Sequence, residues 1–489
     1  MSICNPYLPL DEYIPDAEPH VFGNRVYIYG SHDKEKGSRF CMEDYVVYSA
    51  PVDDLSDWTC HGISYKKSQD PRSSKDKLVD FYAPDCVRGN DGKYYLYYFA
   101  AGPNTKAFGP MSVAVSDRPE GPFEYVGDIQ YSSGEPVLDF LTNDPAVIND
   151  DGKIWLYYGW GLGRDFRNPM MKPIYNTVLK KIGNRSIEDI KSTEPSILSC
   201  AVVELEEDMI TVKGKPKAVL DSKTTAPKDS LLYHHAFYEA ASIRKIHNLY
   251  YLVYSSGENN ELCYATSQYP DREFEYRGVI ISNSNLGYQG NVQRMAPAGT
   301  IHGGIECING KYYVFYHRCT NNTDFSRQAC AEPIEILEDG TIPQVGISSQ
   351  GLNGKPLEAS GTYSAAICCY LYNENTKNVQ GVGHEKEQPT VTAENGEMLV
   401  TAVTNHTKIG YCNFINMGNK KLQLKIRGDG GTVKVYSKEN GATKGELVFQ
   451  PSDDWQVIEI PHCLPKEESM LLLEYIGIGS IDILQLNWI

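Results

Sequence analysis

The sequence of 489 residues lacks the short motifs of several enzyme classes. It has no His-Glu-x-x-His zinc motif, no Gly-Lys-Ser/Thr phosphate loop and no Gly-x-Ser-x-Gly nucleophile motif. The glycine-rich stretch Gly159-Trp-Gly-Leu-Gly163 does not have the spacing of a dinucleotide-binding loop. Zinc-protease, nucleotide-dependent and serine-hydrolase chemistries are therefore unsupported.

Positive charge and long apolar runs are also scarce. The chain has 46 Lys and Arg residues against 63 Asp and Glu residues, a net charge of −17, which argues against nucleic acid and anionic membranes as partners. No apolar run is long enough to span a bilayer. The opening Met1-Ser-Ile-Cys-Asn-Pro6 lacks the basic and apolar regions of a signal peptide, so we expect a cytoplasmic protein. The composition suits a neutral small molecule or a sugar as the substrate. It is compatible with a homo-oligomer.

Disulfides are not expected. The 13 cysteines are odd in number and scattered, so they are interpreted as reduced thiols packed as small apolar groups. Tyrosine is abundant, with 35 copies against 14 Phe. Tyrosine suits sugar binding, because its ring stacks on C–H faces and its hydroxyl hydrogen-bonds. Tyrosine is also a good strand former, and this second interpretation is favoured for most of the copies.

One stretch organises the chain. Residues 144–160 begin with an acidic residue and continue with a short predicted strand, an Asp151-Gly152 turn and a second apolar strand. An Asp-Gly pair between two apolar runs is a strong hairpin signal. Similar hairpins recur with turns at positions 24, 92, 152, 248 and 310. A loose repeat of this kind favours a β-propeller, here with five blades.

An ionisable residue lies a few positions before each of these turns. The five are Asp16, Asp85, Asp144, Glu239 and His302. If equivalent strands run radially around one axis, these side chains converge at the mouth of a central channel. Uncompensated buried carboxylates are costly, so such a cluster indicates a function. Three acids could divide glycoside hydrolysis between a base for water, an acid with a raised pKa and a residue that tunes that acid.

We therefore expect an all-β protein with a five-bladed β-propeller over residues 1–345, a linker over 346–357 and a β-sandwich over 358–489. Little helix is predicted. Residues 161–200 carry Gly, Pro, Asn and charged residues with little alternation, and are interpreted as a long loop or lid close to the pocket.

Residues 1–345 resemble glycoside hydrolase family 43, whose members are five-bladed β-propellers with an inverting mechanism. The motifs that carry the likeness are Pro15-Asp16-Ala-Glu-Pro-His20, Tyr82-Ala-Pro-Asp85, Asn143-Asp144-Pro-Ala, Glu239-Ala-Ala-Ser242 and His302-Gly-Gly. The resemblance implies Asp16 as general base, Glu239 as general acid and Asp144 as the residue that tunes the pKa of the acid. Taken singly, Asp16 and Asp144 could be turn residues beside proline.

The resemblance also implies binding residues. Arg327 would bind sugar hydroxyls, and Tyr82, Asp85 and Trp160 would line the substrate site. His302 resembles a channel histidine that approaches a bound cation, often calcium, whereas the chemistry itself needs no cofactor. Plainer roles stay open: Asp85 as a structural hydrogen-bonding residue, His302 as a core histidine and Arg327 as a surface ion-pair residue.

The C-terminal part more weakly resembles a family 6 carbohydrate-binding module. The likeness rests on Asp453-Asp-Trp455-Gln, Gly428-Asp-Gly-Gly431 and Ile481-Asp-Ile-Leu-Gln-Leu. This part could bind glycan through a residue such as Trp455 or only brace the propeller, and bracing is favoured.

Together these features predict an inverting exo-glycosidase that releases α-L-arabinofuranose, β-D-xylose or both from plant hemicellulose oligosaccharides. An endo-acting arabinanase and a sugar-binding propeller without hydrolysis are the alternatives. A pocket closed by the insertion at 161–200 would favour exo action, and an open groove would favour endo action.

Overall fold

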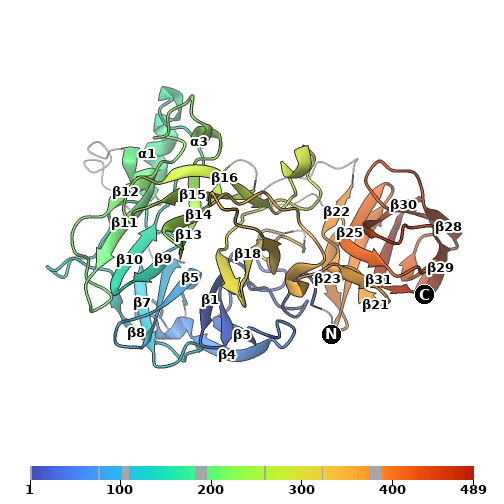
Figure 1. The fold of residues 1–489 in the computed structure, drawn as a ribbon, viewed down its shortest axis with the longest axis horizontal. Helices are drawn as coiled ribbons and strands as arrows, with labels where there is room; N and C mark the ends of the chain where they lie inside the picture. Colours follow the sequence, from blue (N-terminus) through green and yellow to red (C-terminus); the bar gives the residue numbers. More distant parts are fainter. Residues whose placement is uncertain are drawn as a thin grey trace.

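The structure is a computed structural model that describes residues 3–74, 77–101, 109–181, 195–257, 260–321, 323–373 and 388–489. It is built almost wholly of β-strands and has two parts that lie side by side along the long axis of the molecule (Figure 1). Five sheets make up the larger part and two sheets the smaller part, which confirms the predicted all-β propeller and sandwich. None of the helices in these ranges is long and apolar enough to cross a membrane.

The five sheets of the larger part each follow the chain in order, with antiparallel neighbours. Their strands are β1 (Glu18–Phe22), β2 (Arg25–Tyr29), β3 (Tyr45–Pro51) and β4 (Thr59–Tyr65); β5 (Asp80–Arg88), β6 (Tyr94–Ala101), β7 (Ser112–Ser116) and β8 (Glu124–Asp128); β9 (Ala146–Asp150), β10 (Lys153–Tyr158), β11 (Cys200–Leu205) and β12 (Lys217–Leu220); β13 (Phe237–Ile246), β14 (Leu249–Ser256), β15 (Glu261–Ser267) and β16 (Glu275–Ser282); β17 (Ile305–Ile308), β18 (Lys311–Arg318) and β19 (Gln328–Ile334).

The first strand of each sheet lies at the propeller axis. β1 contacts β5 and β17, β9 contacts β5 and β13, and β13 contacts β17, so the five inner strands close a ring. Residues just before or at the start of these strands therefore come to the same end of the axis. This is the physical basis for bringing together side chains that are far apart in the sequence.

The hairpin predicted at Asp151-Gly152 joins β9 to β10. Lys153 pairs with Asp150, and the two loop residues have φ of 50° and 90°, the left-handed values that such a tight turn requires. All residues of β10 after Lys153 are buried, because the strand is covered on both faces by neighbouring sheets. Most of the large, fully buried side chains of the propeller are tyrosines of this kind, as the strand-former interpretation predicted.

The insertion at 161–200, predicted as a long loop or lid close to the pocket, contains helical segments. It holds a short helix η2 (Pro169–Met171), a helix α1 (Lys172–Lys181) and η3 (Pro195–Leu198), and residues 182–194 of it lie outside the described residues. Leu179 of α1 is buried against Leu141 and Leu198, with Trp160 packed on the same cluster. Figure 1 shows α1 beside α3 (Leu231–His234) at one end of the propeller.

The smaller part is a sandwich of two six-stranded sheets. One contains β20 (Leu357–Ala359), β22 (Tyr370–Asn373), β25 (Thr407–Asn416), β27 (Gly431–Tyr436), β28 (Gly445–Phe449) and β30 (Glu468–Gly477); the other contains β21 (Gly361–Ser364), β23 (Thr390–Glu394), β24 (Glu397–Thr404), β26 (Lys421–Gly428), β29 (Ser452–Pro461) and β31 (Ser480–Trp488). Alternate residues of β26, namely Leu422, Leu424 and Ile426, are buried in the core between the sheets, as the period of a half-buried strand requires.

Most of the segment predicted as a linker, 346–357, is packed, although Gly354 and Lys355 are exposed. Ser348 donates to Glu332 at the end of the propeller, and the Ser349 hydroxyl donates to the carbonyl of Ile367 in the sandwich. The Asn5 amide donates to the carbonyls of both Ala331 and Ser348. Hydrogen bonds made on both sides couple the segment to both parts of the molecule.

Candidate active site

A cavity of about 330 Å³ lies at the end of the propeller axis where the inner strands begin. It is lined by Asp16, Phe40, Tyr82, Phe99, Ala101, Asn143, Asp144, Trp160, Tyr238, Glu239, Thr300, Ile301, His302 and Arg327. Every residue predicted for the site is among them except Asp85. The cavity therefore collects its polar groups from all five sheets.

Asp16 is held in place before β1 by two basic residues from the fifth sheet. It has a φ of 59° and is 5% exposed. Its backbone N–H donates to His317 Nδ1 at 3.1 Å, and its Oδ1 accepts from Arg327 at 2.9 Å. Because His317 Nδ1 is an acceptor and its Nε2 lies 2.8 Å from the Thr300 carbonyl, His317 is neutral, in agreement with burial lowering its pKa to about 3. Burial is the largest single influence and opposes ionisation of Asp16, but Arg327 and the other polar neighbours, His302 among them, together outweigh it and hold the Asp16 pKa below its ordinary value.

Arg327 holds Asp16 in place and also lines the cavity, so its binding of sugar hydroxyls stays a prediction. Its Nε and one terminal nitrogen bind Asp33 at 2.8 and 3.0 Å, and the other terminal nitrogen binds Asp16. The guanidinium also stacks over Phe40, 4.8 Å from the ring centre. At 3% exposure Arg327 is not a surface ion-pair residue. With its donors directed at protein acceptors, it fixes the position and charge of Asp16.

Asp144 and the strand that carries Glu239 are directly linked. Asp144 has a φ of 47°, and its Oδ2 accepts from the backbone N–H of Ala240 at 2.9 Å and from the Asn143 amide at 3.0 Å. Ala240 has a φ of 66°, and the β13–β14 register shifts on both sides of Glu239. Left-handed non-glycine residues and bulges of this kind concentrate at functional sites, because they redirect side chains that a regular strand would turn away.

The two carboxyl groups carry raised pKa values. Burial is the main cause that raises the pKa of Glu239 to about 8, and the nearby charge of Asp144 adds to it. Burial likewise raises the pKa of Asp144 to about 6. Near neutral pH, Glu239 is therefore protonated while Asp16 is ionised, so one cavity holds a proton donor and a proton acceptor.

His302 lies between two carboxylates. Its Nδ1 is 3.9 Å from Asp144 Oδ2 and its Nε2 is 3.7 Å from Glu18 Oε1. Burial disfavours its protonation, but Glu18 and Asp144 together raise the pKa of His302 to about 9. His302 is thus a charged bridge rather than a neutral core histidine. Its positive charge partly offsets the carboxylates of the cavity.

The calcium ion that the family resemblance implies would have to lie near His302 and Glu18. Calcium takes six to eight oxygen ligands. Glu18 offers Oε1, whereas its Oε2 already accepts from Ser242 at 3.0 Å and from Arg244 at 3.2 Å. The buried guanidinium of Arg244 also lies 3.6 Å from Glu306, so it places a fixed positive charge across the channel. Glu18 Oε1 and His302 Nε2 are both buried without a hydrogen-bond partner, so they are the two protein atoms that would face such an ion, fewer than calcium takes without water ligands.

Asp85 is the member of the predicted set that the structure moves out of the site. It lies inside β5 and is fully buried. One of its oxygens is 2.6 Å from His20 Nε2 and the other accepts from the Val147 N–H at 2.7 Å. Asp85 thus joins the first, second and third sheets, which corrects the substrate-binding prediction in favour of the structural role.

The remaining walls of the cavity are aromatic. Trp160 and Tyr238 lie on one side with ring centres 6.4 Å apart, and Tyr82 and Phe99 lie on another with centres 6.0 Å apart. Apolar faces with convergent polar groups are typical of sugar sites. The sequence analysis named Tyr82 and Trp160 but missed Tyr238, although it directly precedes Glu239.

Other functional residues were also missed. They are Asp33, His317, Glu18 and Arg244. These residues act through contacts with residues far away in the sequence, and single acidic or basic residues give no sequence signal. The repeat pattern identified one ionisable residue per blade. It could not identify the second layer of residues that sets their charge.

A carboxylic acid and a carboxylate held over one aromatic cavity at a propeller axis define a glycoside hydrolase. The sequence pattern of the glycosyl hydrolases family 43 matches residues 5–198. A "xylosidase/arabinosidase" of Thermoclostridium stercorarium is 37% identical over 98% of this chain and 97% of its own length. Another from Bacteroides ovatus is 32% identical over 64% of this chain and 88% of its own length. The chain belongs to glycoside hydrolase family 43.

Solved structures agree with this assignment. A family 43 enzyme from Xanthomonas citri, complexed with xylose, superimposes with a TM-score of 0.54 at 27% identity, covering 72% of this chain and 95% of that one. A β-xylosidase/α-arabinofuranosidase from a compost metagenome, in complex with xylotriose, gives a TM-score of 0.53 at 29% identity, covering 71% of this chain and 98% of that one.

Proposed function

We propose that the chain is an inverting exo-glycosidase that releases α-L-arabinofuranose, β-D-xylose or both from hemicellulose-derived oligosaccharides. The observation that carries the proposal is the pairing of an ionised Asp16 with a protonated Glu239 in one cavity. The names of the relatives support the two sugars. The modest size of the cavity supports exo action, because it suits the end of a chain better than its middle.

In the proposed reaction Asp16 removes a proton from water as the oxygen attacks the anomeric carbon. Glu239 donates its proton to the glycosidic oxygen, so that the leaving group departs as an alcohol. Asp144 keeps Glu239 protonated by like-charge repulsion and fixes its strand through the Ala240 N–H. Arg327 keeps Asp16 ionised. No other group is needed to balance the protons.

Proton NMR of the first product tests this mechanism. An inverting enzyme needs room for water between base and acid, so the Asp16 and Glu239 carboxyl groups are expected roughly 6.5–9.5 Å apart, against about 5–5.5 Å in a retaining pair. The released sugar should therefore appear first with inverted anomeric configuration, before mutarotation. Retained configuration would refute the roles given to Asp16 and Glu239.

We further propose that Arg244 supplies the positive charge that a calcium ion would otherwise bring to the channel. Its contacts with Glu18 and Glu306 support this proposal.

For the sandwich we propose a bracing role, supported by the packed segment 346–357, although a module that binds glycan stays an alternative. We also propose a cytoplasmic location, which the 13 unpaired cysteines support.

A further inference from the structure

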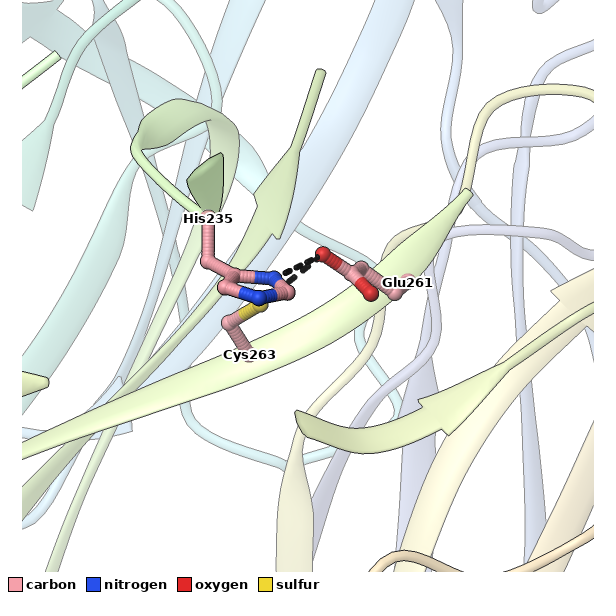
Figure 2. Close-up of side chains that lie close together, drawn as sticks. All are labelled: His235, Glu261 and Cys263. Carbon is pink, nitrogen blue, oxygen red and sulfur yellow. Dashed lines mark hydrogen bonds and ion pairs between the residues drawn. The ribbon is translucent and has the colours of Figure 1, made fainter. Parts of the chain in front are cut away.

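A second cluster of ionisable side chains lies in the fourth sheet, outside the cavity. His235 precedes β13, while Glu261 and Cys263 are two residues apart on β15, so they lie on the same face of that strand. His235 Nδ1 is 2.6 Å from Glu261 Oε1, and Cys263 Sγ is 3.6 Å from the same oxygen. Figure 2 shows the three side chains converging on one point.

No Lys or Arg of the described chain pairs with Glu261, and its basic partner is His235, at 2.6 Å. Glu261 is 3% exposed, and its described partners are His235, Cys263 and the Ser256 hydroxyl, which donates to the same oxygen at 2.7 Å. Buried carboxylates are costly unless they are paired or coordinate a metal. Here the two ionisable neighbours of the carboxylate are themselves metal-ligating side chains.

We propose that His235, Glu261 and Cys263 form a zinc site. Imidazole, thiolate and carboxylate are the ligand types that Zn²⁺ takes in proteins. A carboxylate and a thiolate cancel the two positive charges of the ion, so the filled site is neutral and suits its buried position. The neutral imidazole adds a third ligand, and the fourth position is left for water or the Ser256 hydroxyl.

The geometry requires only a small adjustment. The three ligand atoms already lie within 4.8 Å of one another. In a tetrahedral site with bonds of about 2.0–2.3 Å, ligand atoms are separated by about 3.3–3.8 Å. The His235–Glu261 contact must therefore open by roughly 1 Å, and His235 can move because it is partly exposed and lies in the short connection between α3 and β13.

Neighbouring residues orient the imidazole. The ring of His235 stacks on Tyr276 with centres 5.2 Å apart and an angle of 8°, and the Tyr254 hydroxyl donates to the His235 carbonyl at 2.8 Å. Supporting contacts of this kind hold a ligand in position for a metal. Zinc would join the start of β13 to β15, so it should raise the melting temperature without touching substrate.

The test uses the full chain after removal of metals with a chelator. Titration with Co²⁺ is followed by absorption, and Zn²⁺ uptake is followed by elemental analysis. We expect one equivalent of metal, a thiolate-to-cobalt charge-transfer band and a higher melting temperature with Zn²⁺. His235→Asn and Cys263→Ser should weaken binding by at least about 10-fold. Cys200→Ser is the matched control, because Cys200 is also a fully buried strand cysteine but belongs to no ligand cluster among the described residues. This variant should bind metal as the unchanged chain does.

The outcome in the unchanged chain decides the question even where a variant fails to fold. A stoichiometric charge-transfer band establishes a thiolate ligand. Absence of that band, or its persistence in Cys263→Ser, overturns the proposal. Hydrolysis is measured alongside, and its loss or retention bears on the proposed function rather than on the metal site.

Discussion

Replacing Asp144 by Asn tests the electrostatic control of the acid. Burial raises the pKa of Glu239 to about 8, with Asp144 as the next contributor. Asn keeps an oxygen that can accept from the Ala240 N–H, so the change removes charge with little change in shape. Without the like charge, the Glu239 pKa should fall by on the order of one unit, which corresponds to about 1.4 kcal/mol. Glu239 acts in its protonated form, so activity is lost as the pH rises through its pKa, and this loss should begin at lower pH in the variant.

The assay is the pH profile of kcat/KM, which reports the pKa values of the free enzyme. A xylo-oligosaccharide without an activated leaving group is the substrate of choice, because its hydrolysis depends on protonation by Glu239. Asp150→Asn is the matched control, since Asp150 lies at the far end of β9, where it pairs with Lys245. The basic limb should move in Asp144→Asn and stay in place in Asp150→Asn. An unmoved limb in the first variant, or equal movement in both, would refute the reasoning.

Three further predictions follow from the same site. Glu239→Gln should lower turnover of unactivated oligosaccharides by roughly 10²–10⁴-fold and that of 4-nitrophenyl glycosides much less, so equal losses on both substrates would contradict the acid role. Arg327→Met removes the charge that holds the Asp16 pKa down, so the acidic limb of kcat/KM should move to higher pH; a limb that stays in place would remove Arg327 from the control of Asp16. Chelation with EDTA should leave the initial rate of hydrolysis unchanged, because Arg244 already supplies positive charge to the channel, and a loss that Ca²⁺ restores would refute this role.

The predicted ring of ionisable residues was accurate where the residue lies before or at the start of an inner strand. Asp16, Asp144 and His302 precede their strands, and Glu239 is displaced toward the cavity by irregular pairing in β13. Asp85 lies well inside β5, and its side chain hydrogen-bonds to a neighbouring sheet instead of reaching the cavity. These residues lie at similar distances before their turns, so spacing in the sequence does not distinguish Asp85 from the others. The difference comes from where each strand begins and from the bulge in β13.

The sequence by itself determined the repeated hairpins and therefore the propeller, because turn residues and the burial pattern of a strand are local properties of the chain. It also indicated the ionisable residue that reaches the cavity in four of the five repeats, all but that of Asp85. Only the tertiary structure decided how those residues are charged. Asp16 is ionised because of Arg327, which is 311 positions away, and Glu239 is protonated because it is buried beside Asp144. Burial and charge–charge contacts act through space, so no spacing along the chain encodes them.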